Sequence, residues 1–142
     1  MLTGFLILIV GIALLPTASD AQQPPNGAAR TTVCDLLREP DRFNRKPVEI
    51  DAQISWSEEG SVIFDQKCSG SIPFGVSPQM DARTQKQYLR LMRLLKKTNV
   101  AARVSGVFEH SEERVWGHQS MFDSRLLTTE ISRVRAAPRN KP

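Results

Sequence analysis

The segment from His110 to Ser124 holds the residues whose types are best suited to ligand binding. Trp116 offers an aromatic ring, Arg114 a cation, and His118 a ring that donates or accepts hydrogen bonds. An aromatic surface beside a cation suits stacking on a nucleic-acid base or a sugar. The structural alternative is that Trp116 and its apolar neighbours cover the end of a small β-domain. The sequence alone leaves both interpretations open.

Catalytic chemistry has no comparable support. The neighbouring carboxylates Glu58–Glu59 and Glu112–Glu113 would point apart on a strand, so neither pair suits acid/base catalysis. His110 and His118 are too few for a zinc site without carboxylate ligands. Phosphate-binding, dinucleotide-binding and hydrolase motifs are missing from the sequence. We predict a non-enzymatic protein with no catalytic residues, no metal site and no cofactor.

A second feature with binding potential is a stripe of cations between residues 81 and 97. This segment has six basic residues and one acid, Asp81. Five of the six recur every three or four positions, opposite an apolar side that includes Tyr88, Leu91 and Leu95. The stripe consists of Arg83, Lys86, Arg90, Arg93 and Lys97. Four more basic residues and no acid lie between 133 and 142.

Two interpretations fit this stripe. One is an ordinary solvated helix face that keeps the protein soluble. The other is an anion-facing surface for phospholipid headgroups, an acidic protein or a polyanion. The whole chain has a formal net charge of +4, and residues 81–97 alone contribute +5. The positive charge is therefore localised.

The first 21 residues predict export. Phe5 to Leu15 is uncharged and apolar, but it is shorter than the about 20 residues of a spanning helix. Ser19 and Ala21 then stand at the −3 and −1 positions of a cleavage after Ala21. We predict a cleaved signal peptide and a periplasmic or secreted protein with no transmembrane span. An N-terminal membrane anchor is the alternative, because no Lys or Arg precedes the apolar run.

Cys34 and Cys68 are the two cysteines of the chain, and both lie in the exported part. Thiol pairs in an oxidising compartment usually form disulfides. Their spacing is not that of a CxxC redox or metal motif. We therefore predict a structural Cys34–Cys68 bridge, with a redox or metal pair as the alternative.

The segment between the two termini is predicted to form one small, mainly β domain. Residues 22–30 (QQPPNGAAR) are predicted as a flexible linker, 31–135 as one domain, and 136–142 as a disordered tail. Alternating apolar residues predict strands at 46–56, 61–65, 72–76, 100–109 and 125–134. A short helix is expected at 31–38, and a longer one at 77–97 that opens at Ser77-Pro78 or is capped by Asp81.

Strand phase gives further expectations. Trp56 is in phase with the core residues of 46–56, so it should be buried. Gly106 should mark a bend or a bulge. Leu127, Thr129 and Ile131 are expected to share one face of the last strand.

A single amphipathic helix between the third and fourth of five strands is the layout of an OB-fold, a small Greek-key barrel. The fold class predicted is therefore mainly β, a five-stranded barrel with a short N-terminal helix. OB-folds bind ligands through the loops that join strands 1–2 and 4–5. Trp56 adjoins the first loop, and Arg114, Trp116 and His118 lie in the second.

The segment CDLLREPDRFNRKPVEIDAQI resembles the opening of small exported bacterial OB-fold-like proteins, most of them uncharacterised. Their pattern of a short helix and a Pro-x-x-Phe/Tyr-x-x-Lys-x-Val-x-Val lead is matched by Pro40, Phe43, Lys46, Val48 and Ile50. The stretches RVSGVF and GHQSMFDSRLL are similar to the corresponding later parts. The resemblance implies the fold, and it supplies no catalytic residue.

We therefore predict a non-enzymatic binding or interaction module of the cell envelope or the secreted space. Its partner is expected to be an envelope protein or an anionic surface component. The alternative is an oligonucleotide- or oligosaccharide-binding OB-fold that uses the loop between the fourth and fifth strands. Nucleic acid is the less favoured partner, because few such targets exist outside the cytoplasm.

Overall fold

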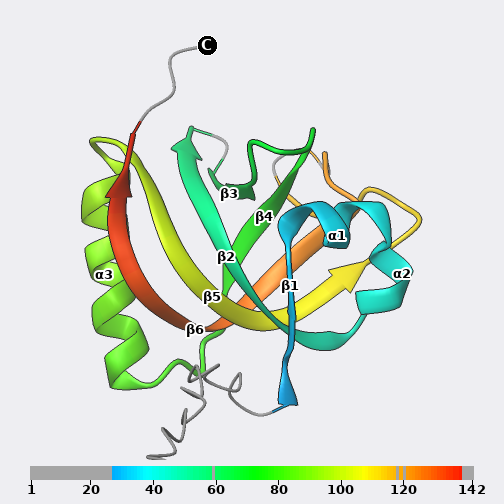
Figure 1. Ribbon diagram of the computed structural model, residues 1–142, viewed down its shortest axis with the longest axis horizontal. Helices are drawn as coiled ribbons and strands as arrows, with labels where there is room; N and C mark the ends of the chain where they lie inside the picture. The colour runs from blue at the N-terminus through cyan, green and yellow to red at the C-terminus, as the bar shows by residue number, and fades with distance from the viewer. Residues whose placement is uncertain (1–26, 59, 118, 120, 139–142) are drawn as a thin grey trace, which may run out of the picture.

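The five predicted strands close a barrel in a computed structural model that describes residues 27–138 except 59, 118 and 120. The strands follow the order β2–β3–β4–β6–β5, and β5 pairs back onto β2 (Figure 1). Their bounds are β2 Lys46–Ser57, β3 Gly60–Phe64, β4 Ser71–Val76, β5 Asn99–His110 and β6 Ser124–Ala137. β4 and β6 pair in parallel, and the other barrel pairs are antiparallel. The predicted OB-type barrel is confirmed.

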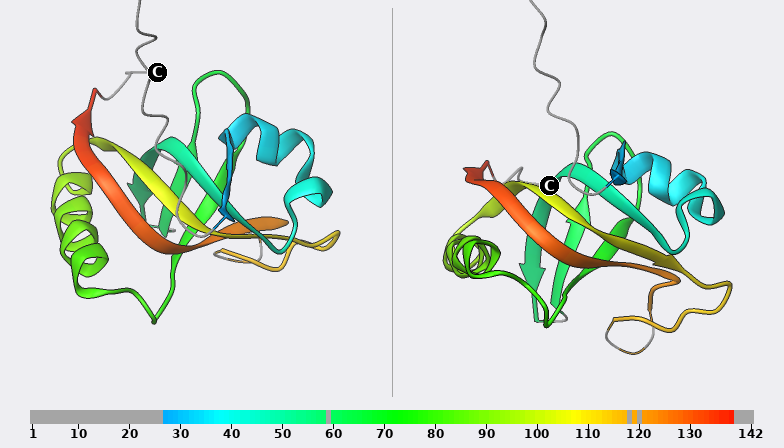
Figure 2. Two further views of the ribbon diagram at one scale, coloured as in Figure 1. Left: turned by 60° about the horizontal axis from the view of Figure 1, so that its bottom comes forward. Right: turned by 90° about the horizontal axis from the view of Figure 1, so that it is seen from below.

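Helix α3 (Ala82–Leu95) connects the third barrel strand to the fourth, as predicted, and packs mainly against β5 and β6 (Figure 2). The sequence predicted that this helix begins either at Ser77-Pro78 or at a cap formed by Asp81, and the structure shows the Asp81 cap. Its carboxylate accepts a hydrogen bond from the Thr84 amide at 2.7 Å. Ser77 instead belongs to the barrel, because its amide donates to the Thr128 carbonyl at 2.8 Å.

Three short elements precede the barrel: β1 (Ala29–Thr31), α1 (Val33–Arg38) and α2 (Pro40–Phe43). The predicted N-terminal helix is α1, which Thr32 caps by accepting a hydrogen bond from the Asp35 amide at 3.1 Å. The sequence did not predict α2 or β1. β1 begins inside the segment interpreted as a linker and adds to β2 in parallel, with Thr31 opposite Ile50.

The predicted disulfide is confirmed. Cys34 in α1 and Cys68 in the β3–β4 turn are bonded, with Cα atoms 5.7 Å apart. The bridge closes a loop with a sequence separation of 34, which stabilises the fold by about 3–4 kcal/mol in the chain-entropy model. It attaches the N-terminal helices to the barrel.

The alternation in β2 predicted the core well. Val48, Ile50 and Ile54 are fully buried, and Leu91 of α3 meets them in the same cluster. The prediction that Trp56 is buried was wrong: the residue is in phase with the inward-facing residues of β2, but its side chain is 54% exposed. The strand extends beyond the core at this end, and the residue opposite Trp56 is the small Ser61.

The expected phase of β6 was wrong. Leu126 and Thr128 are buried, whereas Leu127 and Thr129 are not, although Ile131 is. The β5–β6 register shifts twice, once beside Gly106 and once near Arg103, and each shift changes which side chains face inward. Gly106 lies at the first shift, as predicted. A Cβ there would stand 2.3 Å from the Leu127 carbonyl oxygen.

Residues 1–21, the predicted signal peptide, lie outside the described residues. The strand β6 runs to Ala137, so the predicted tail from residue 136 begins too early; the Thr98 hydroxyl donates to the Ala137 carbonyl at 2.7 Å. In residues 27–138, as far as they are described, no helix is long and apolar enough to cross a bilayer.

Candidate binding surfaces

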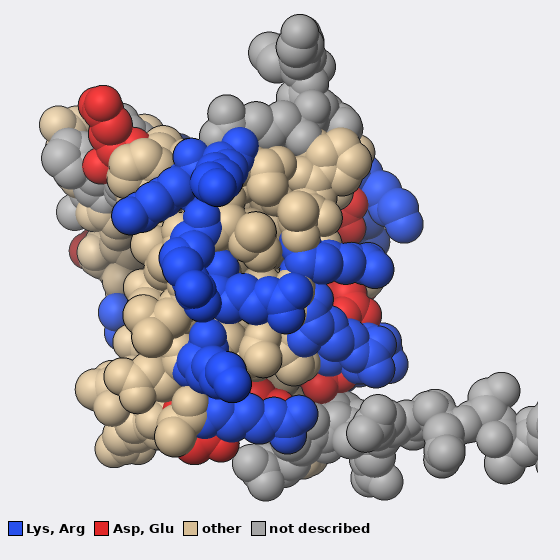
Figure 3. Space-filling view, turned by 90° about the vertical axis from the view of Figure 1, so that its left-hand side faces the viewer, with Lys and Arg blue, Asp and Glu red and all other residues tan. Residues whose placement is uncertain are grey.

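The stripe of cations on α3 forms one exposed surface. Arg83, Lys86, Arg90, Arg93 and Lys97 are all exposed, whereas Leu91 and Leu95 on the opposite side are buried. Figure 3 shows Lys and Arg side chains gathered over this side of the molecule. We call the five stripe residues, together with Leu89, the α3 face.

No described carboxylate forms an ion pair with a cation of the α3 face. Asp81, the one acid in residues 81–97, serves as the helix cap. Hydrogen bonds from the Thr84 backbone and side chain lower the pKa of Asp81, so it stays ionised at neutral pH. The nearby Arg83 also lowers this pKa, so Asp81 offsets part of the charge at the start of the stripe, and the other four cations have no ion pair with a described side chain.

The α3 face also has an apolar component. Leu89 is 57% exposed and lies at the edge of the row of cations, one helical turn before Arg93. The Arg93 guanidinium donates to the Leu89 carbonyl at 3.3 Å, which holds it beside this leucine. A shallow hollow of about 360 Å³ lies between Arg90, Arg93, Leu94 and Lys97.

The β5–β6 loop folds back on itself. The Val115 and Trp116 amides donate to the Phe122 carbonyl at 2.9 and 3.1 Å, and the Phe122 amide donates to Trp116 at 3.1 Å. The Arg125 guanidinium lies over the Trp116 ring, 5.3 Å from its centroid. Trp116 is half-buried, and Arg114 is exposed. His118 lies outside the described residues.

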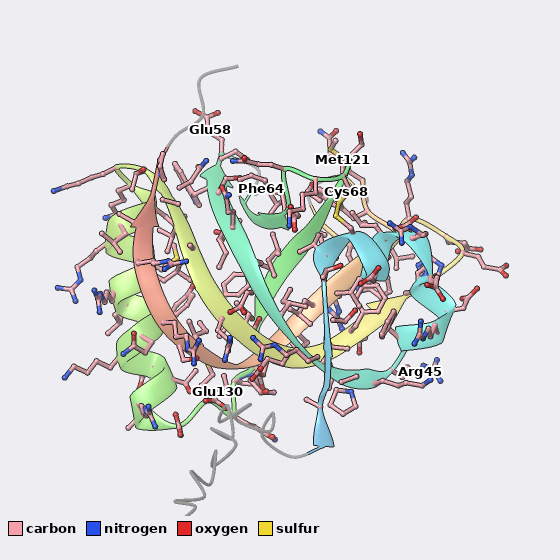
Figure 4. The ribbon with its side chains drawn as sticks, in the orientation of Figure 1. Arg45, Glu58, Phe64, Cys68, Met121 and Glu130 are labelled. Atoms are coloured by element: carbon pink, nitrogen blue, oxygen red, sulfur yellow. A yellow bond between two sulfur atoms is a disulfide. The ribbon has the colours of Figure 1, made fainter. Side chains whose placement is uncertain are left out.

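The two loops expected to form one ligand site both lie along the upper edge of the view in Figure 4, but they are set apart there. Figure 4 places Glu58 of the β2–β3 turn and Met121 of the β5–β6 loop apart, with Phe64 of β3 between them. Within the described residues, no ring contact joins Trp56 to Trp116. A ligand that used both indoles would have to lie across the strands between these loops.

A third polar region was missed by sequence reasoning. Arg103 of β5 donates to both carboxylate oxygens of Asp51 at 2.9 and 2.8 Å, and lies 3.8 Å from the carboxylate of Glu49. Arg30 of β1 also pairs with Asp51, at 3.1 Å. The hydrogen bonds from Arg103 hold the pKa of Asp51 below its ordinary value and raise that of Arg103. We call these four residues the β-face cluster.

The β-face cluster borders a groove of about 660 Å³ on the outer surface of β2, β5 and β6. Arg133 and Arg135 reach this groove from β6. The one signal in the sequence is the break of alternation at Val134, which is typical of a bulge. Among the described residues, no group of three or more His, Cys, Asp and Glu is placed to hold a metal ion.

Comparison with known proteins supports the fold only. No family model matches the chain, and no curated protein matches it. A solved chain assigned as an aspartyl-tRNA synthetase, from Leishmania major Friedlin, matches with a TM-score of 0.52 and 16% identity. The match covers 84% of this chain and 23% of the synthetase chain. The present chain is therefore similar in fold to a minor part of that protein.

Proposed function

We propose that this protein is a non-enzymatic binding module of the cell envelope or the secreted space, and that its α3 face attaches it to an anionic phospholipid surface. The proposal includes export by residues 1–21 and kinship with the exported bacterial proteins that its opening segment resembles. The observation that supports it most is the row of five exposed cations with no described carboxylate partner.

The physical argument has an electrostatic and an apolar part. Each Lys or Arg held near an anionic bilayer surface contributes about 1 kcal/mol. Leu89 supplies an exposed apolar side chain beside the same row, which suits the boundary between headgroups and acyl chains. Because α3 packs against β5 and β6, the cations are presented together on a rigid support.

The test is co-sedimentation of the exported chain with vesicles of phosphatidylglycerol and phosphatidylcholine, or of phosphatidylcholine alone. We expect binding to the anionic vesicles that weakens at high salt. The double variant Arg90→Gln/Arg93→Gln should bind about 30-fold more weakly, since two contributions of about 1 kcal/mol are lost.

Arg38 and Arg42 provide a matched control. Both are exposed and have the same charge, but they pair with Asp35 and Glu39 at 3.4 and 3.3 Å. The variant Arg38→Gln/Arg42→Gln should keep its vesicle binding. Equal binding to neutral and anionic vesicles, or equal losses in both double variants, would refute the lipid proposal.

A second candidate is an oligonucleotide- or oligosaccharide-binding function of the β5–β6 loop. Its support is the exposed Trp56 and Arg114 on the two loops that OB-folds use, together with the fold likeness to a protein whose name includes tRNA. Fluorescence anisotropy of a labelled single-stranded oligonucleotide tests it at low and physiological salt. If this candidate is right, the oligonucleotide should bind even at physiological salt. The variant Trp116→Ala should then lose this binding without a change in melting temperature. A large fall in melting temperature would instead assign Trp116 a packing role.

A further inference from the structure

The groove beside the β-face cluster is large enough for a small molecule. Its volume of about 660 Å³ lies within the range of about 300–1,000 Å³ that is usual for such sites. Its lining combines cations with one aromatic ring, Phe64, and an amide, Gln53. It lies on the outer faces of the strands, away from the β5–β6 loop discussed above.

The floor of the groove is electrically balanced and fixed. The Arg103 side chain is 10% exposed, and Asp51 and Glu49 both face it. With Arg30, the β-face cluster holds two positive and two negative groups. Arg103 is therefore committed to its carboxylates and is not free to bind a ligand anion.

The wall formed by β6 is different. Arg133 and Arg135 are exposed, and neither forms an ion pair with a described residue. Asp65, which directly follows β3, is a carboxylate of the lining; it accepts a hydrogen bond from the Lys67 amide at 2.9 Å and forms no ion pair with either arginine. Two guanidinium groups thus remain available on one side of the groove.

A bulge places both of them there. Regular alternation from the buried Ile131 would point Arg133 and Arg135 into the core and Val134 outward. The register shift opposite Ala101 and Arg103 reverses this: Val134 is buried, and both arginines face out. Arg133 adopts φ +53°, in the left-handed region that is unfavourable for a residue with a Cβ. The fold therefore accepts local backbone strain at the residue that enters the groove.

We propose that this groove is a binding site for a small organic oxyanion, a phosphate monoester or a carboxylate, held by Arg133 and Arg135. Planar guanidinium groups bind both oxyanions through paired hydrogen bonds. Arg103 offsets the charge of Asp51, and Arg133 and Arg135 outnumber Asp65, the other carboxylate of the lining. The Phe64 ring and the Gln53 amide also line the groove and can contact the body of the ligand. This site is separate from the α3 face and does not depend on lipid binding.

The experiment is an NMR titration of the exported chain, labelled with ¹⁵N, at physiological salt. Ribose 5-phosphate is the probe for a phosphate monoester, and succinate is the probe for a carboxylate. We expect saturable shifts at residues of β2, β5 and β6 that line the groove with at least one probe, and the stronger probe identifies the oxyanion. No saturable shift with either probe would overturn the proposal.

Variants separate the groove from general charge attraction. Arg133→Asn removes a charge while it keeps a residue that tolerates the left-handed conformation, and Arg135→Gln removes the second charge. The double variant should keep its melting temperature and lose at least tenfold in affinity. The control Arg90→Gln/Arg93→Gln removes the same charge from the α3 face and should bind the probe normally. Equal losses in both variants would mean non-specific attraction and would refute the site. Vesicle binding by the groove variant should be unchanged, whatever the outcome for α3.

Discussion

Arg103 in β5 and Arg90 in α3 have the same charge in opposite surroundings. Arg103 is almost fully buried and has a two-point hydrogen bond to Asp51, with Glu49 close by. Arg90 is exposed, and no described carboxylate pairs with it. A buried charge must be compensated within the fold, whereas an exposed one is free for a partner. The two regions therefore differ in role: the β-face cluster meets its charges within the fold, whereas the α3 face leaves its cations exposed, as the proposed binding to an anionic surface requires.

The largest test of this comparison is Arg103→Met. The change leaves the buried Glu49 carboxylate without its cation, which should destabilise the protein by about 3–5 kcal/mol. Urea unfolding followed by circular dichroism measures this loss. Arg93→Met on α3 is the control, and it should leave the free energy of unfolding nearly unchanged. A loss below about 1 kcal/mol for Arg103→Met would contradict the role given to the cluster.

Acid sharpens the same comparison. The hydrogen bond from Arg103 holds the pKa of Asp51 in the folded state below the ordinary value of 3.8 for this group. Its stabilising contribution is therefore present above pH 3.8 and is lost as the pH falls through the lower, folded-state pKa. Urea unfolding between pH 6 and pH 2 should show this loss in the native chain and a shallower one in Arg103→Met. Identical profiles would exclude Asp51 as the group responsible.

A smaller effect is expected at the edge of the cluster. Arg30 pairs with the same Asp51, but both side chains are about half exposed. Exposed ion pairs contribute about 0.2–1 kcal/mol, so Arg30→Gln should lower stability by that amount. High salt should reduce the difference between Arg30→Gln and the native chain. A loss as large as that of Arg103→Met would mean that exposure does not decide the value of these pairs.

The smallest change in stability is expected on α3. Arg90→Gln/Arg93→Gln removes no ion pair that the structure shows, so the free energy of unfolding should stay within about 0.5 kcal/mol. The same variant should nevertheless bind anionic vesicles poorly. Thermal unfolding and vesicle sedimentation of one preparation give both values. A clear loss of stability would show that these cations support the fold after all.

The sequence was a good guide to the fold where a regular period decides burial. The alternation of Val48, Ile50 and Ile54 predicted β2 and its inner face, and cysteine usage predicted the disulfide. Errors arose where geometry breaks the period. Two bulges change the phase of β6, and β2 continues past the core at Trp56. Local composition also concealed β1, because its pairing with β2 depends on a distant segment.

The candidate surfaces also differ in how far the sequence alone could predict them. Helical spacing revealed the cations of the α3 face, since all of them lie on one element. The groove is built from β2, β5 and β6, so Asp51, Arg103 and Arg133 become neighbours only through strand register. A single sequence does not contain that register. Whether Trp56 and Trp116 can bind one ligand likewise depends on tertiary geometry; Figure 4 shows Glu58 and Met121, which lie on the two loops, set apart.

The Cys34–Cys68 bond has a consequence for proteolysis. The chain from Cys34 to Cys68 is a covalent ring that contains β2, β3 and the turn between them. One cut by an extracellular protease in that turn would open the ring without releasing a fragment. Glu49 and Asp51 would stay attached to the remainder of the protein, and the cut would become visible on a gel only after reduction.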